Sequence, residues 1–283
     1  MAGQGVLPEA VTPENAPIID RNENFQAILR TFESASHRRN FKMILQGKRL
    51  LITGGARRIG AAIAVKAAEA GCSVLLGYCN SANEADEVLA ALPGCGHRKI
   101  QADLSTSAGV KRLIAEAGEF ELLVNSAAIF HKPGSPEDLA AEKLYHQINF
   151  LAPATLLEQL FSQNIPHCAA VNITDAFALA PGSGAYWQSK RDLTELTISL
   201  AEKWAENDCR INAVAPGAVL PPPWAPESRM EKILTQVPLH RAVKVGDIAQ
   251  TVMFLLKNES ITGAVIPVDC GISAKLRAPT PRC

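Results

Sequence analysis

Two side chains that could transfer a proton lie one helical turn apart in the stretch "YWQSK". Tyr186 and Lys190 are four residues apart in a segment, 185–206, whose pattern predicts a helix, so they share one face of it. A free phenol has a pKa of about 10, too high for efficient proton transfer near neutrality, and a neighbouring ammonium group lowers that pKa. The pair therefore predicts a proton donor, Tyr186, with Lys190 as its electrostatic modifier. A contact between two surface side chains is the alternative.

A glycine-bearing turn, "TGGARRIG" at residues 53–60, follows an apolar run and precedes an alanine-rich segment. Free N–H groups and the dipole at a helix start favour an anion, and glycine lets a ligand approach the backbone closely. Arg57 and Arg58 add guanidinium groups, whose rigid fork of donors suits phosphates and planar heterocycles. The turn therefore predicts a site for nucleotide phosphates, with a plain tight turn as the alternative.

The rest of the chain predicts the scaffold that these residues need, because short apolar runs alternate with longer helical patterns. The expected strands are 49–53, 73–78, 99–103, 121–127, 168–174, 210–215 and 264–269. The expected helices are 59–71, 81–92, 107–117, 139–163, 185–206 and 246–257. Strands that are apolar throughout are typical of a parallel sheet buried on both faces. We predict an α/β fold: a single doubly wound Rossmann-type domain at 43–283, with a seven-stranded parallel sheet and helices on both faces. Residues 1–42, rich in proline and polar residues, are expected to be a partly disordered N-terminal extension.

The composition excludes several classes of protein. Lys and Arg balance Asp and Glu at 28 each, which argues against binding to nucleic acid. No apolar run reaches the roughly 18 residues of a membrane span. The seven cysteines are scattered, without a CxxC pair, and Cys168 stands in an apolar, strand-like stretch. We therefore expect reduced thiols, no zinc or other metal, and a cytoplasmic location.

Polar residues and turn formers end several of the expected strands. Asp103 ends the third strand, Asn125 ends the fourth, and "APG" at 215–217 ends the sixth. Since the carboxyl ends of parallel strands meet at one edge of a sheet, all of these face one crevice. The glycine turn, the strand-end Asn125, the YxxxK motif and the Pro-Gly pair follow one another along the chain in this order. In this combination the chain resembles the short-chain dehydrogenase/reductase superfamily over residues 47–275. The resemblance implies a nicotinamide cofactor and a homotetramer or homodimer.

Finer features resemble the pteridine reductase branch, which includes the dihydromonapterin reductases. Arg58 replaces the middle glycine of the usual T-G-x-x-x-G-x-G turn, and "NITDAF" has Asp175 where most relatives place a serine. Phe130 follows "NSAAI", where the branch stacks a pterin ring, and "QVPLHR" and "ITGAVIPVDCG" match its closing segments. The proline-rich stretch 218–230 is expected to form a substrate lid, with Trp224 touching the substrate or sealing the lid.

The resemblance carries roles over to individual residues. The implied catalytic residues are Asp175, Tyr186, Lys190 and Asn149, which would hold a proton-relay water. The implied cofactor-binding residues are Gly54, Arg57, Arg58, Ile59, Gly60, Tyr78, Asn80, Ser81, Asp103, Leu104, Asn125, Ser126, Ala127, Thr174, Tyr186, Lys190, Pro216 and Gly217. The implied substrate-binding residues are Arg58, Phe130, Asp175, Tyr186 and Trp224.

Two features remain open. The second strand ends in "GYCNSANEA", with neutral Asn80 and Ser81 and no acid at its tip to grip a ribose hydroxyl, so NADP(H) is expected over NAD(H). Asp175 stands eleven residues before Tyr186, where relatives have thirteen, which predicts a shortened loop at 178–184. Thr174 is the rival polar candidate, and a turn cap is the alternative role for Asp175.

The leading hypothesis is an NADPH-dependent reductase of a dihydropteridine, of pterin or biopterin type and possibly of folate type. A 3-oxoacyl or other carbonyl reductase is the second hypothesis. A catalytically weak NADP(H)-binding protein that acts through partners is the third.

Overall fold

Seven strands form one parallel sheet in the order β3-β2-β1-β4-β5-β6-β7. The computed structural model of the chain describes residues 45–179, 184–222 and 224–277, apart from the side chains of Glu227 and Arg277. The strands are β1 (Arg49–Thr53), β2 (Ser73–Tyr78), β3 (Arg98–Gln101), β4 (Leu122–Asn125), β5 (Ala169–Ile173), β6 (Arg210–Pro216) and β7 (Val265–Val268). The strand order reverses between β1 and β4, and this switch point opens a crevice at the carboxyl edge of the sheet. The predicted fold class is confirmed. The predicted extension, residues 1–42, lies outside the described residues.

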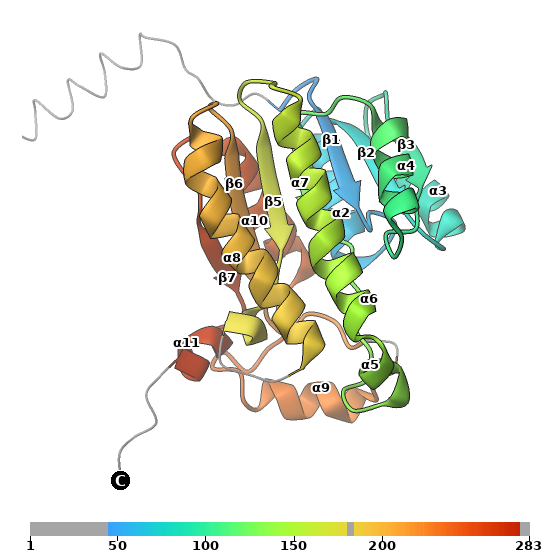
Figure 1. Cartoon of the computed structure of the whole chain (residues 1–283). Helices are drawn as coiled ribbons and strands as arrows, with labels where there is room; N and C mark the ends of the chain where they lie inside the picture. The colour runs from blue at the N-terminus through green and yellow to red at the C-terminus, as the bar shows by residue number, and fades with distance from the viewer. Residues whose placement is uncertain (1–44, 180–183, 223, 278–283) are drawn as a thin grey trace, which may run out of the picture. The chain divides into compact units, whose positions relative to one another are not determined.

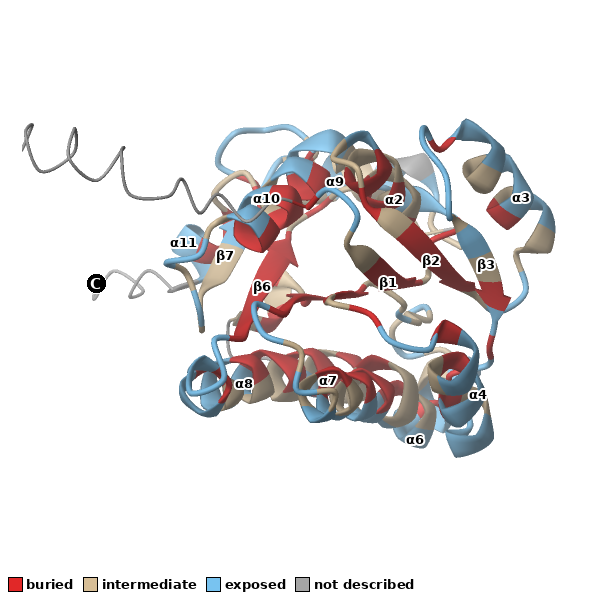
Figure 2. Cartoon of the chain, turned by 90° about the horizontal axis from the view of Figure 1, so that it is seen from above, coloured by how far each residue is buried: buried red, intermediate tan, exposed pale blue. Residues whose placement is uncertain are grey.

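Helices cover both faces of the sheet, as predicted (Figure 2). They are α2 (Arg58–Glu69), α3 (Ala82–Ala91), α4 (Ser107–Ala117), α7 (Ala152–Ser162), α8 (Ala185–Ala205) and α10 (Val245–Lys257). Helices α4, α7 and α8 lie on one face, and α2, α3 and α10 lie on the other. No described helix is both long and apolar enough to cross a membrane.

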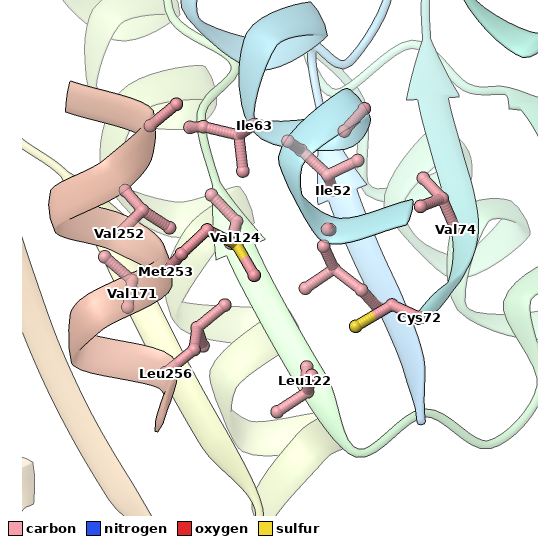
Figure 3. Packing of buried hydrophobic residues seen from close by; sticks show 14 of the residues in the cluster. Ile52, Ile63, Cys72, Val74, Leu122, Val124, Val171, Val252, Met253 and Leu256 are labelled. Carbon is pink, nitrogen blue, oxygen red and sulfur yellow. The ribbon is translucent and has the colours of Figure 1, made fainter. Parts of the chain in front are cut away.

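The larger core cluster fills the space between the sheet and α2 and α10 (Figure 3). Ile63 of α2 and Val252 of α10 pack there against Val124 and Val171 of the central strands. All four side chains are almost completely buried. Each such side chain contributes about 1.5–3 kcal/mol of burial free energy, which keeps the carboxyl ends of β1, β4 and β5 in fixed positions.

The predicted single helix at 139–163 is wrong, because the structure divides it. The pieces are α5 (Pro136–Ala140), α6 (Glu142–His146), the π-helical turn η2 (Gln147–Leu151) and α7. Pro153 has no N–H to donate to the carbonyl of residue 149, so the regular α-helical ladder is interrupted at this point. Three short elements were not predicted: η3 (Ala176–Leu179), α9 (Glu227–Leu234) and α11 (Ile272–Arg277). Figure 1 shows α9 beneath the carboxyl ends of the strands.

The expectation of reduced thiols is wrong for one pair of cysteines, because Cys168 and Cys209 form a disulfide. Ala169 of β5 is the register partner of Arg210 of β6, so the residues just before them also face each other. Their Cα atoms are 4.7 Å apart, within the range that a disulfide requires. The sequence could not indicate this pairing because it does not contain the register of β5 against β6.

Candidate active site

The turn between β1 and α2 is held against β4 by hydrogen bonds and by close glycine packing. Thr53 Oγ1 accepts from the backbone N–H groups of Ser126 and Ala127, at 3.1 Å each. Gly54 has φ +64°, and a Cβ at Gly60 would lie 2.1 Å from the carbonyl oxygen of Gly54. Only glycine at both positions gives this close approach of helix to strand, as a dinucleotide-binding turn requires. Thr53, which holds the turn in this way, was not among the predicted site residues.

The start of α2 leaves donors for a phosphate. Its N-cap residue, Arg57, forms no side-chain capping bond. The first N–H groups of a helix attract an anion. The exposed Arg57 guanidinium lies 3.6 Å from the carboxylate of Glu84 on α3, a partner that was not predicted. Ile59 occupies the first turn of α2 and packs against the core.

The tip of β2 lies beside this helix start, and it carries the predicted neutral residues. Tyr78 ends β2, Asn80 is exposed, and Ser81 is the N-cap of α3. The strand before Asp103 ends at Gln101, two residues earlier than predicted, so Asp103 stands in an exposed turn. Hydrogen bonds from Ser105 hold the pKa of Asp103 below its usual value. Leu104 next to it is buried.

A buried chain of amides runs across the carboxyl edge. Asn125 Nδ2 donates to Asn172 Oδ1, and Asn172 Nδ2 donates to Thr197 Oγ1, at 2.9 Å each. Asn125 Oδ1 is buried and has no hydrogen-bond partner within the described part of the chain. A donor on a ligand would satisfy this oxygen. Together with the glycine turn and the free start of α2, it fits a nicotinamide dinucleotide.

Tyr186 and Asp175 meet at the first turn of α8, as their predicted roles require. The Tyr186 hydroxyl donates to Asp175 Oδ2 at 2.9 Å. Burial raises the pKa of Tyr186 well above its usual value of 10, and the negative charge of Asp175 raises it further. Burial also raises the pKa of Asp175 above 3.8. Both shifts favour the protonated forms.

The predicted role of Lys190, to lower the pKa of Tyr186, remains a prediction. Lys190 Nζ donates to the carbonyl oxygen of Ile173, the last residue of β5, at 2.9 Å. Burial lowers the pKa of Lys190 from 10.5 to about 8. A buried ammonium therefore lies at the base of the site, bonded to the strand end.

Thr174 and Asp175 have different partners. Thr174 Oγ1 donates to the carbonyl of Val214 in β6, so this hydroxyl is used inside the sheet. The other carboxylate oxygen of Asp175 accepts from Phe177 N at 2.8 Å, as a turn cap does, and the catalytic role of Asp175 remains a prediction. The remainder of the shortened loop, 180–183, lies outside the described residues.

Asn149 is completely buried within the π-helical turn. Its Oδ1 accepts from Ile129 N at 3.0 Å, and its Nδ2 donates to Ile129 O and to Ser189 Oγ. The side chain thus ties η2 to the segment after β4 and to α8. Its predicted relay water remains a prediction.

Aromatic rings enclose the hydroxyl of Tyr186. The ring centroid of Phe130 lies 4.4 Å from that of Tyr186 and 5.7 Å from that of Trp224. Tyr145 and Trp187, which were not predicted, add edge-on contacts to Tyr186 at 5.8 and 5.6 Å. Trp187 is the sequence neighbour of Tyr186, whereas Tyr145 reaches it through the fold alone.

The lid segment is fastened at two points. Trp224 Nε1 donates to the carbonyl oxygen of Phe130 at 3.2 Å, so Trp224 seals the lid onto the body, one of its two predicted roles. Arg58 donates to the carbonyl oxygens of Leu220 and Pro221 at 3.0 and 3.1 Å. The sequence had assigned Arg58 to phosphate and substrate, and its contact with the lid was not predicted. Its φ of +54° is the left-handed conformation that the usual glycine adopts easily.

Pro216 and Gly217 close the opposite side of the crevice. Gly217 N donates to Val268 O of β7 at 3.0 Å. A Cβ at Gly217 would lie 2.7 Å from Asp269 Cα, so β6 and β7 approach closely here. Their predicted contact with the nicotinamide remains a prediction.

Comparison with known proteins identifies the family. Residues 54–273 match the family model described as Enoyl-(Acyl carrier protein) reductase. The chain is 31% identical over 244 residues to 3-oxoacyl-(acyl-carrier-protein) reductase FabG of Staphylococcus aureus, covering 80% of this chain and 98% of the relative. The chain is a short-chain dehydrogenase/reductase.

Solved structures of short-chain dehydrogenase/reductases agree with this assignment. The enzyme from Serratia marcescens BCRC 10948 superposes with a TM-score of 0.74 at 28% identity, covering 81% of this chain and 99% of that chain. FolM alternative dihydrofolate reductase 1 from Brucella canis, complexed with NADP, superposes with a TM-score of 0.74 at 31% identity, covering 84% and 98%. As a short-chain dehydrogenase/reductase, the protein is an oxidoreductase that uses a nicotinamide cofactor and a small-molecule substrate.

Proposed function

We propose that the protein is an NADPH-dependent reductase of a dihydropteridine. One observation carries this proposal: the hydroxyl of Tyr186 is bonded to the carboxyl of Asp175 beneath the ring of Phe130. A ketone needs one proton donor at its oxygen, which a tyrosine can supply alone. A pteridine is flat and is protonated at a ring nitrogen, so an aromatic wall and a second proton-holding group favour it.

The chain's residues divide the work of this reaction. When bound, the reduced nicotinamide supplies a hydride to the carbon of a C=N bond. Tyr186 donates its proton to the nitrogen of that bond, which completes the addition of two hydrogens. The hydrogen bond to Asp175 holds the phenol in one orientation, and the proton on Asp175 replaces the one that Tyr186 has donated. Lys190 provides a positive charge close to the phenolate that forms.

The preference for NADPH rests on the charges near the tip of β2. Arg57 offers a guanidinium that reaches Glu84 on α3, the helix whose N-cap is Ser81, and neither this group nor neutral Asn80 and Ser81 would repel a 2′-phosphate. Glu84 pairs with Arg57 and weakens this attraction. The NADP-bound FolM neighbour supports the same preference.

A second candidate is reduction of a 3-oxoacyl thioester. It is favoured by the likeness to FabG, which extends over 98% of that relative. Asp175 in place of a serine argues against it, because the Asp175 oxygen accepts the hydrogen bond of Tyr186 where a serine hydroxyl could donate one to the ketone oxygen.

The two functions separate in one assay of NADPH oxidation. We expect turnover with dihydrobiopterin or dihydrofolate and little or none with acetoacetyl thioesters. The reverse result would contradict the proposal and favour the second candidate. Tight NADPH binding without turnover on either class would favour a binding protein that acts through partners.

We also propose that the protein assembles as a homodimer or homotetramer. Ile198 on α8 and Phe254 on α10 are about half exposed, at 54% and 49%, which is unusual for large apolar side chains. Light scattering after gel filtration gives the mass, and a monomer would contradict the proposal.

A further inference from the structure

A cavity of about 250 Å³ lies between three elements that were not predicted from the sequence. Its walls are Phe177 of η3, Ile272 of α11, and four residues of α9 and its end, which are Arg229, Lys232, Ile233 and Gln236. Figure 1 shows α9 and α11 at the end of the molecule where the strands terminate, on the same side as the start of α8.

The size of this cavity suits part of a ligand. Pockets that hold a whole drug-sized molecule usually measure about 300–1,000 Å³. The cavity of about 250 Å³ is below that range, and none of its walls carries a group that donates a proton as Tyr186 does. It therefore fits the end of a substrate whose reacting group lies elsewhere.

The charge of the cavity selects an anion. Arg229 and Lys232 line it, and no acidic residue does. Neither cation forms a salt bridge with any side chain that the structure describes. Lys275 lies next to it on α11 and donates to the carbonyl oxygen of Gln236 at 2.9 Å. Cations along an apolar wall concentrate anions there, while Phe177, Ile233 and Ile272 suit an apolar or aromatic linker.

Two series of contacts join the cavity to the reacting centre. On the lower wall, Phe177 donates its N–H to Asp175, which in turn accepts from Tyr186. On the lid, Arg229 lies over the ring of Trp224, with its Cζ 4.7 Å from the ring centroid. Trp224 is bonded to Phe130, whose ring touches Tyr186. Two of the residues that line the cavity, Phe177 and Arg229, are therefore linked through one or two intermediate residues to Tyr186.

We propose that this cavity binds an anionic tail of the substrate, a carboxylate or phosphate on an apolar or aromatic linker, while the group to be reduced lies on Tyr186. The inference rests on the proposed function only in placing the reduced group at Tyr186. The same tail chemistry belongs to the glutamyl end of a folate and to the phosphate end of a pantetheine thioester.

The test uses matched pairs of substrates that share the reacting group and differ in the tail. Dihydrofolate has the anionic tail and dihydrobiopterin lacks it. Acetoacetyl-CoA and acetoacetyl-N-acetylcysteamine form the corresponding thioester pair. The variant is Lys232→Gln, at an exposed position, and the control is Glu231→Gln, also exposed and on the same helix. Arg229→Lys keeps the charge and tests whether charge is what matters.

For a partly exposed ion pair, we expect Lys232→Gln to raise the KM of the tailed member about fivefold, with kcat and the KM of the tailless member nearly unchanged. Glu231→Gln and Arg229→Lys should change the KM of the tailed member less than twofold. Added salt should reduce the difference in KM between the tailed and the tailless member of a pair. An equal effect of Lys232→Gln on both members overturns the inference.

The outcomes also separate this inference from the proposed function. If the protein reduces only the thioester pair, the pteridine assignment fails. The effect of Lys232→Gln on the KM values of the two thioesters then tests the role of the cavity. If neither pair is reduced, calorimetric binding of 4-aminobenzoyl-glutamate and of pantetheine 4′-phosphate decides. Binding that weakens in Lys232→Gln supports the inference, and no binding, or binding that is unchanged in the variant, overturns it.

Discussion

On the nucleotide side of the crevice, the turn at 53–60 packs directly on the neighbouring backbone, whereas on the substrate side the lid at 218–230 is fastened by the ends of two long side chains. Thr53 Oγ1 accepts from main-chain N–H groups just after β4, and Gly60 packs on the carbonyl of Gly54. The lid depends on Arg58, 163 residues before Pro221, and on a bond that spans 94 residues from Trp224 to Phe130. The first side is therefore rigid and independent of the substrate, and the second can be altered without loss of the fold.

The largest expected effect comes from removing the proton donor on the substrate side. Tyr186→Phe should lower kcat about 10²- to 10⁴-fold, because general acid catalysis is lost, while NADPH affinity stays within about twofold. Steady-state kinetics and quenching of NADPH fluorescence measure the two quantities.

Tyr145→Phe is the matched control, since its ring also packs on Tyr186 but its hydroxyl donates to Asp138. It should cost about 1 kcal/mol of stability and little activity. Normal turnover in Tyr186→Phe, or an equal loss in both variants, would show that the phenol is not the donor.

The second prediction disturbs the turn at 53–60 on the nucleotide side. A Cβ at Gly60 meets a backbone oxygen at 2.1 Å, so Gly60→Ala must displace either α2 or the turn. We expect NADPH affinity to fall at least about tenfold and the free energy of unfolding to drop by about 1–3 kcal/mol. Gly246→Ala is the control, because nothing lies within 4 Å of its added methyl group, and it should be neutral or slightly stabilising. Equal behaviour of the two variants would contradict the close-packing argument.

The same contrast explains what the sequence could predict. The sequence predicts all seven strands, the glycine turn, and the residues Asn125 and Asp175 at the ends of strands. These features depend on residues that are close together in the sequence. The broken helix at Pro153, the aromatic contacts of Tyr145, and the bond from Arg58 to the lid depend on which segments meet in three dimensions. The disulfide of Cys168 has the same origin, since it depends on strand register.

Asp175 connects the chemistry to stability. Because burial raises its pKa above 3.8 in the folded state, its contribution to stability is complete below pH 3.8 and is lost as pH rises through the raised value. Asp175→Asn has no such charge to bury. Relative to wild type, it should therefore gain stability from pH 4 to pH 7 while losing about tenfold in kcat. Urea unfolding at several pH values measures the difference, and parallel curves for the two proteins would contradict a raised pKa.

Arg58 lies in the turn on the nucleotide side and bonds to the lid on the substrate side. Two substitutions separate the effect of its backbone conformation from the effect of its bond to the lid. Arg58→Gly removes the lid contact and relieves the positive φ, whereas Arg58→Ala removes the contact alone. The glycine variant should be more stable than the alanine variant by about 1 kcal/mol. Both should speed amide exchange equally at residues 218–222. If neither variant affects exchange there, the lid is held by Trp224 alone.

The smallest effect concerns the exposed pair of Arg57 and Glu84. Their side chains are 64% and 42% exposed, so the pair is worth at most about 1 kcal/mol and is screened by salt. Glu84→Gln releases Arg57 and removes a negative charge from the neighbourhood of the proposed 2′-phosphate. NADPH should bind about threefold tighter at low salt, NADH should not change, and the gain should fade at high ionic strength. Glu87→Gln, on the same helix and also exposed, controls for general charge. An equal gain for NADH would mean that Arg57 does not face the phosphate, and the nucleotide side would then hold its cofactor by backbone groups alone.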